Sequence, residues 1–217
     1  MKMPCGMSLL AGVLGAIQLE TRAALADTIL ADPSRMMTTA KRMDFVGRSG
    51  MSVVQTPSGP CLRSTPHQSA SGLYQAVDTG AAQLKHVSWT WRVDQLQASA
   101  DLRKLETEDS AATLFFIFGE PSLFNRDVPT LAYVWSGTPV ADGTVFKSAR
   151  FSSLHYIQLH GAKAAGTWQT DTRDIAADYR AIFHAEPGPL KFISLFNDND
   201  QTGEPTSAMF CPVRDEQ

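Results

Sequence analysis

The sequence predicts an all-β protein, a single jelly-roll-like β-sandwich with one short helix. Short apolar runs recur between turns rich in Gly and Pro from Asp44 onward, and only one stretch has helical spacing. Many short strands with a single helix are typical of two packed sheets. At 217 residues, 43% hydrophobic and 19% charged, the chain can bury one sizeable core and does not have the composition of a disordered protein.

The strands follow from periodicity. In Ser88–Val93 the residues Trp89, Trp91 and Val93 fall on one face, a period of two. Ala111–Phe118 is apolar on both faces, which predicts a central strand covered on both sides. Further strands are expected at 52–55, 72–77, 131–135, 153–159, 191–196 and 208–211. The helix is expected at 174–183, where Ile175, Tyr179, Ile182 and Phe183 share one face.

The N-terminus has the features of a signal peptide. Lys2 precedes the uncharged apolar run 7–17, which is shorter than the about 20 residues that span a bilayer. An A-x-A pattern then ends at Ala26. We therefore predict a signal peptide at 1–26, a leader segment at 27–43, a β-sandwich domain at 44–217, and a periplasmic or secreted product without a membrane span. An N-terminal helix packed on the domain is the alternative.

Cleavage after Ala26 would remove Cys5 and leave Cys61 and Cys211. An even pair in an oxidising compartment predicts a disulfide that ties an early strand to the last one. On the chain-entropy model it would stabilise the fold by roughly 4–5 kcal/mol. The alternative is two buried free thiols.

The charge balance gives no support to nucleic-acid binding, since 19 Lys and Arg stand against 22 Asp and Glu. The sequence also contains no G-x-S-x-G, H-E-x-x-H, P-loop or Rossmann glycine string. Both observations favour a protein that is neither a nucleic-acid binder nor an enzyme of these classes. The oligomeric state does not follow from the sequence.

The string Asn197–Gly203 resembles the opening of a calcium loop, in which Asp198, Asp200 and Thr202 would supply oxygen ligands. An EF-hand is excluded because Met209 occupies the twelfth position, where a bidentate Glu is required. Calcium could still bind there with oxygens from elsewhere. The alternative is a hairpin turn whose side chains hydrogen-bond their own backbone.

Two other groups of residues could carry function. Asp109 directly precedes the apolar strand 111–118, and it could pair with another carboxylate as acid and base, add a ligand to the Asp198 loop, or mark a solvated strand entrance. Aromatic side chains could stack on sugar rings or pack in the core, namely Trp89, Trp91, Tyr133, Trp135 and Trp168. Trp168 is the best candidate for exposure, since polar residues flank it.

Three strings resemble the DUF3047 family of bacterial proteins of unknown function. They are Trp89–Val93, Asp109–Phe118 with the later Tyr133–Trp135, and Gly166–Arg180 leading to Asn197–Gly203. Thr113 stands where the family usually has Arg, and Asn197 replaces a usual Thr; if that Arg belongs to a binding site, the site is altered here. The resemblance implies an exported β-sandwich similar to galactose-binding-like and carbohydrate-binding modules, without an established activity.

The leading hypothesis is an exported, non-catalytic binding module of the cell envelope that recognises a glycan or other small polar ligand. The residues expected at its site are Asp109, Arg173, Asp174, Asp198 and Asp200, with Trp168 stacking on the ligand. It rests on the fold class and the acidic loop, by analogy. One alternative is an envelope polysaccharide hydrolase or lyase with Asp109 and Asp198 as its carboxylate pair. Another is a structural or assembly partner.

Overall fold

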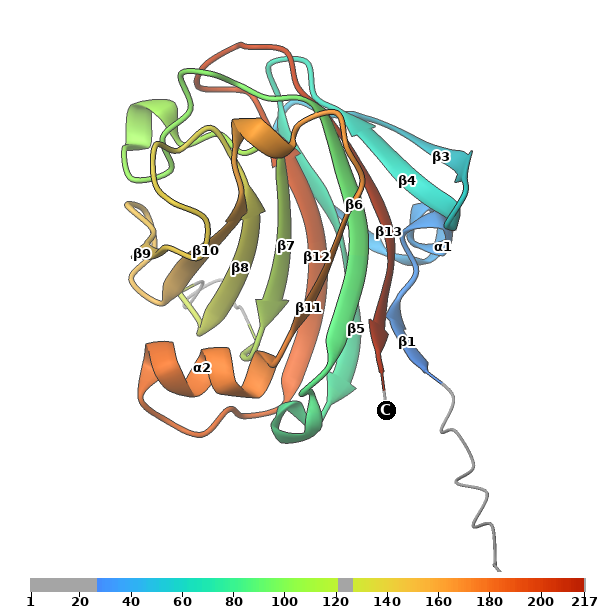
Figure 1. Ribbon diagram of the computed structural model, residues 1–217, viewed down its shortest axis with the longest axis vertical. Coiled ribbons are helices and arrows are strands. Elements are labelled where there is room, and N and C mark those ends of the chain that lie inside the picture. The colour runs from blue at the N-terminus through green and yellow to red at the C-terminus, as the bar shows by residue number, and fades with distance from the viewer. Residues whose placement is uncertain (1–26, 121–126, 217) are drawn as a thin grey trace, which may run out of the picture.

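The computed structural model describes residues 27–120 and 127–216, which form two stacked sheets (Figure 1). The jelly-roll-like β-sandwich expected from the sequence is confirmed. The six-stranded sheet has the order β11 (Gln169–Arg173), β6 (Val87–Gln95), β13 (Ser207–Asp215), β4 (Gly59–Thr65) and β3 (Gly50–Thr56), with β1 (Thr28–Ala31) paired to β13. The seven-stranded sheet has the order β2 (Lys41–Val46), β5 (Ala70–Thr79), β12 (Leu190–Asp198), β7 (Ala112–Ile117), β8 (Thr130–Trp135), β10 (Leu154–His160) and β9 (Val145–Lys147).

The pairing is antiparallel except between β8 and β10, which run parallel. The expected helix is α2 (Ile175–Phe183), and the structure adds a second one, α1 (Pro33–Thr39), so the prediction of one helix is incomplete. Helix α1 begins where the Asp32 side chain accepts hydrogen bonds from the backbone amides of Ser34 and Arg35. Short 3-10 turns occur at Ala81–Gln83, Leu105–Thr107 and Ala162–Ala164.

The inner faces of the two sheets pack an aromatic core. Trp91, Tyr133 and Trp135 are fully buried there, and Trp89 is 3% exposed. The Trp91 and Trp135 rings lie 5.8 Å apart, and those of Trp89 and Tyr133 lie 5.1 Å apart. Four of the five aromatic residues considered for a stacking platform are therefore core residues, and only Trp168 remains partly exposed.

The predicted disulfide is confirmed, since Cys61 on β4 is bonded to Cys211 on β13, with Cα atoms 4.4 Å apart. It joins neighbouring strands that are 150 residues apart in the sequence. This crosslink ties the C-terminal strand to an early one inside the six-stranded sheet.

The predicted signal peptide, residues 1–26, lies outside the described residues. The segment 27–43, expected as a leader, contains β1, α1 and the start of β2, and Met36 of α1 is fully buried in the core. Among the described residues, no helix is both long enough and apolar enough to cross a bilayer.

Strand β7 is central in the seven-stranded sheet, as the sequence predicts. Its inward residues Leu114 and Phe116 are buried in the core. Its outward residues Phe115 and Ile117 are only half-buried, because they line a groove on the outer face of this sheet. The inward face of β7 is therefore apolar because it packs in the core, and the outward face is apolar because it lines the groove.

Candidate functional site

The outer face of the seven-stranded sheet carries a groove of about 910 Å³. This volume lies in the upper part of the range of about 300–1,000 Å³ that is usual for small-molecule sites. The groove crosses β2, the start of β5, β12, β7, β8 and β10. Its aromatic floor consists of Phe45, Phe115, Phe151, Tyr156 and Phe196, with aliphatic side chains between them.

The aromatic floor follows from strand alternation and from one glycine. Phe196 of β12 lies 5.9 Å from Phe115 of β7 and 5.9 Å from Phe45 of β2, both edge to face. Gly72 of β5 pairs with Phe196, and a Cβ at Gly72 would clash with the Leu195 carbonyl oxygen and press on the Phe196 ring. Phe45 is the most exposed ring of the floor, at 60%, whereas Phe196 is 8% exposed. The floor therefore presents aromatic surface to solvent.

One end of the groove is acidic. Asp198 and Asp200 line it, and Asp109 lies behind them, with one carboxylate oxygen of each within 4.8 Å of the others. We call these three residues the acidic end. They meet because β7 and β12 are antiparallel neighbours. The residues before β7 and those at the end of β12 therefore lie at the same end of this strand pair.

The three carboxylates differ in how they are satisfied. Asp109 is fully buried, and its two oxygens accept hydrogen bonds from the backbone amides of Gln201 (3.2 Å) and Thr202 (2.6 Å). Asp198 Oδ1 accepts from the amide and hydroxyl of Ser110, at 2.7 and 3.0 Å. Asp200 Oδ1 is buried and has no hydrogen-bond partner. Only Asp109 is thus fully used by the fold.

The electrostatics of the acidic end follow from burial and mutual repulsion. Burial, and then the nearby Asp109 carboxylate, raise the pKa of Asp198 well above its usual range and also raise that of Asp200. Arg150 is the one basic side chain among the described residues that line the groove, and its Nε lies 3.0 Å from Glu108 Oε2. The acidic end therefore carries an excess of hydrogen-bond acceptors.

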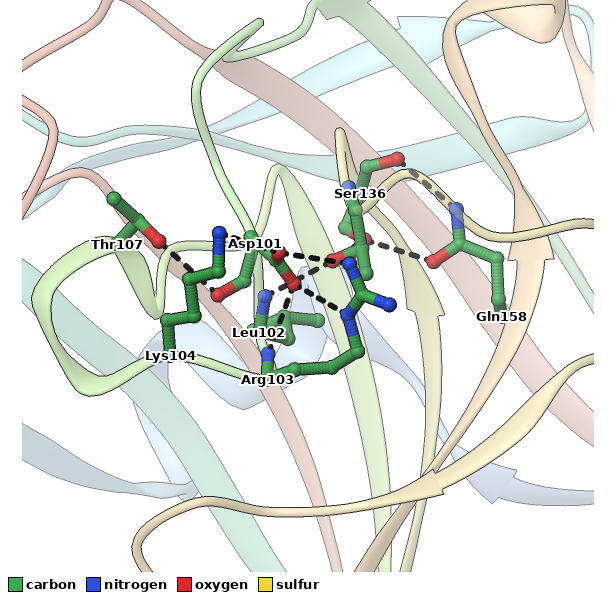
Figure 2. Close-up of polar contacts among 8 residues, drawn as sticks. Asp101, Leu102, Arg103, Lys104, Thr107, Ser136 and Gln158 are labelled. Carbon is green, nitrogen blue, oxygen red and sulfur yellow. Dashed lines mark hydrogen bonds and ion pairs between the residues drawn. The ribbon is translucent and has the colours of Figure 1, made fainter.

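The loop at residues 96–111 forms one wall of the groove, and a polar network holds it (Figure 2). Asp101 accepts hydrogen bonds from Arg103 Nε (2.8 Å) and Nη2 (2.9 Å), and Lys104 Nζ lies 3.4 Å away. The Leu102 amide donates to the Thr138 hydroxyl at 3.0 Å. We call this network, with Ser136 and Gln158 beyond Thr138, the loop anchor.

The same loop is also fastened to the loop that follows β12. Gln97 Nε2 donates to the Asp198 carbonyl oxygen, and the backbone amides of Ala98 and Ser99 donate to the Glu204 carboxylate. Both loops that carry the acidic end are therefore held by specific hydrogen bonds. Such fixed side chains can present their remaining acceptors without further ordering.

The structure brings together Asp109, Asp198 and Asp200 of the predicted site residues. Thr202, predicted as a calcium ligand with Asp198 and Asp200, instead accepts a hydrogen bond from the Glu204 amide and gives its own amide to Asp109. The structure thus places Asp109 with the two aspartates. A ligand role for Thr202 stays a prediction. Calcium binding here stays a prediction.

The other predicted ligand-binding residues lie away from the groove, because β11 joins the six-stranded sheet. Arg173 pairs with Asp178, which also accepts a hydrogen bond from the Tyr133 hydroxyl at 2.6 Å. Asp174 caps α2 through the Ala177 amide. Half-buried Trp168 directly precedes β11. A binding role for Trp168, Arg173 and Asp174 stays a prediction.

Sequence reasoning missed the groove itself and its aromatic floor. The available signal was the central strand 111–118, whose outward face is as apolar as its inward face. Thr113, the position where the family resemblance leads to an expected Arg, lies in the floor and is 1% exposed. Its hydroxyl is 2.7 Å from that of Ser110, next to Asp198.

The fold and the site together define a β-sandwich with a ligand-sized groove on the outer face of one sheet and an acidic end to that groove. The chain belongs to the family described as Protein of unknown function (DUF3047), whose model matches residues 42–214. No curated protein sequence matches the chain.

Several solved structures are similar in fold. They include the family 11 carbohydrate-binding module of cellulosomal cellulase Lic26A-Cel5E of Clostridium thermocellum, with TM-score 0.46, 10% identity, and coverage of 88% of this chain and 95% of that chain. The carbohydrate esterase vb_24B_21 from Shiga toxin-encoding bacteriophage phi24B has TM-score 0.44 and 10% identity, covering 88% and 100%. The K3 cleaved adhesin domain of Lys-gingipain from Porphyromonas gingivalis has TM-score 0.40 and 14% identity, covering 87% and 98%.

Proposed function

We propose that this protein is an exported, non-catalytic binding module of the cell envelope that holds a glycan in the groove on its seven-stranded sheet. The observation that carries the proposal is the groove of about 910 Å³, with an aromatic floor and acceptor groups at one end. Sugar rings offer an apolar C–H face to aromatic side chains and hydroxyl donors to carboxylates. A glycan therefore matches both parts of the groove.

The position of Asp109 does not suit the alternative in which Asp109 and Asp198 act as a catalytic pair. An acid–base pair must flank a shared space in which the substrate lies. Asp109 is fully buried behind Asp198, and both of its oxygens are occupied by backbone amides. The Asp109–Asp198 pair therefore has only one member, Asp198, that lines the groove.

The test is a glycan array probed with the purified protein, with and without calcium, and repeated with Thr113→Arg. A long side chain at this floor position should fill the groove and reduce glycan binding by at least about tenfold. Val53→Arg is the matched control, because Val53 is 44% exposed on β3 of the other sheet. We expect this control to bind like the wild type.

Circular dichroism and thermal melting must show that Thr113→Arg is folded. Phe115→Ala provides a second variant, since it removes one ring of the floor from a half-buried position. Unchanged binding by both variants would place the ligand elsewhere, and no binding in either calcium condition would remove the proposal.

Export is tested separately by fractionating cells that express the full chain. We expect the protein in the periplasmic or secreted fraction with Asp27 at its N-terminus, as measured by mass spectrometry. An intact N-terminus in the cytoplasmic fraction would contradict this part of the proposal.

A further inference from the structure

The acidic end has acceptors that the fold does not use. Asp198 is 7% exposed, and among the described residues no group donates to its Oδ2. Asp200 Oδ1 and Gln201 Oε1 are buried and have no hydrogen-bond partner. All three residues line the groove. Buried acceptors without donors are costly, so a ligand that supplies donors there gains binding energy.

No described basic side chain forms an ion pair with these carboxylates, although Arg150 lies near enough to favour the charged form of Asp200. The ion pairs of the described residues include none to Asp198 or Asp200, and Arg150 is paired with Glu108. Burial and the charge of Asp109 act against ionisation at both positions. A cation placed between the two carboxylates would relieve this repulsion and would itself be held by charge-assisted hydrogen bonds.

We infer that the glycan held in the groove is an amino sugar, whose free ammonium group binds at Asp198 and Asp200 while its ring lies on Phe115 and Phe196. This inference rests on the proposed function and names its ligand class. An ammonium group has three N–H donors and no acceptor. It matches the three unused acceptors of Asp198, Asp200 and Gln201.

The available oxygen atoms of the acidic end suit an ammonium group better than a divalent cation. Calcium takes six to eight oxygen ligands. Here both oxygens of Asp109 and Oδ1 of Asp198 already accept hydrogen bonds from the protein. The apolar floor also continues directly from the carboxylates, which suits a group attached to a ring.

The experiment compares β-1,4-linked oligomers of glucosamine, N-acetylglucosamine and glucose, matched in length, by isothermal titration calorimetry. The ammonium form should bind about ten- to hundredfold more tightly than the two neutral forms, the effect of one or two charge-assisted hydrogen bonds. Added salt should weaken the binding of the glucosamine oligomer and leave the binding of the two neutral oligomers unchanged.

Asp198→Asn and Asp200→Asn should each abolish most of this preference, measured within each variant as the ratio of its affinities for the glucosamine and glucose oligomers. Asp94→Asn is the matched control, because Asp94 lies on β6 in the other sheet and pairs with Arg92. Two aspartate variants are used so that a folding defect in one leaves the other to decide.

Equal affinity for the three oligomers would overturn the inference and leave the proposed function standing. The inference would also be overturned if both aspartate variants kept the preference, or if calcium displaced the glucosamine oligomer and stabilised the protein by itself. If no oligomer or arrayed glycan binds the wild type, the proposed function fails, and the inference fails with it.

Discussion

Asp101, in the loop at residues 96–111, and Asp198, at the end of β12, are in opposite electrostatic situations. Asp101 belongs to the loop anchor, where the Arg103 guanidinium lowers the pKa of its carboxyl to about 2 (Figure 2). Later in the same loop, Asp109 accepts a hydrogen bond from the Thr202 amide, and the Ser110 amide donates to Asp198. Burial and the Asp109 carboxylate raise the pKa of Asp198. One carboxylate stabilises the fold when ionised, and the other opposes folding when ionised.

This difference separates the carboxylate that positions the loop from the carboxylates that are available to a ligand. Both oxygens of Asp101 are paired with cations of the chain itself, so the loop anchor has nothing to offer a ligand. Asp198 and Asp200 have acceptors in a groove and form no ion pair with a described residue, since the nearby Arg150 is paired with Glu108. A buried charge left without a partner is destabilising, and such groups are typical of functional sites.

The largest effect is expected for Asp109→Ala. Asp109 belongs to the acidic end, but both of its carboxylate oxygens accept hydrogen bonds from the fold. The change would leave the partly buried backbone amides of Gln201 and Thr202 without their acceptor. At about 1–3 kcal/mol for each unsatisfied group, unfolding should become easier by about 3 kcal/mol. Urea unfolding measures the loss, and a loss below about 1 kcal/mol would show that the turn does not depend on this carboxylate.

The second effect is expected for Asp101→Asn in the loop anchor. A carboxyl whose folded pKa lies below its unfolded value stabilises the protein above the unfolded pKa, and this stability is lost as the pH falls from about 4 to about 2. The variant should therefore be about 2 kcal/mol less stable at pH 7 and equal to the wild type near pH 2. Unfolding curves at both pH values decide it; a constant difference would point to lost packing instead.

Sequence reasoning reached the fold because the core strands carry their own pattern. The alternation of Trp89, Trp91 and Val93 was enough to predict β6, and the two remaining cysteines predicted the disulfide. Edge strands were harder. Strand β11, with the sequence QTDTR, is polar throughout, and only its pairing with β6 makes it a strand.

Only part of the site could be predicted from the sequence, and the reason is topological. Asp109 and Asp198 are 89 residues apart in number, and they meet because β7 pairs with β12. Arg173 is nearer to Asp198 in the sequence, yet β11 carries it into the other sheet. The aromatic floor draws on strands whose spatial order differs from their sequence order, and no local pattern encodes that order.

A smaller effect of opposite sign is expected for Asp198→Asn. A carboxyl whose folded pKa is raised contributes stability at low pH, which is lost as the pH rises through the folded pKa. Asn keeps the Oδ1 acceptor for Ser110 and removes the charge. The variant should gain about 1 kcal/mol at pH 8 and lose the wild type's rise in stability on mild acidification. Thermal melting across this range measures both; destabilisation at pH 8 would contradict the contrast with Asp101.

The smallest effect is expected for Asp200→Asn, because Asp200 is only partly buried and solvent screens its charge. It should stabilise the protein by a few tenths of a kcal/mol at pH 8. The gain should shrink further in the background of Asp198→Asn, since the repulsion between the two carboxylates is then already gone. A double-mutant cycle of unfolding free energies measures this coupling. Strictly additive effects would show that the two carboxylates do not act on one another and would separate the acidic end into independent groups.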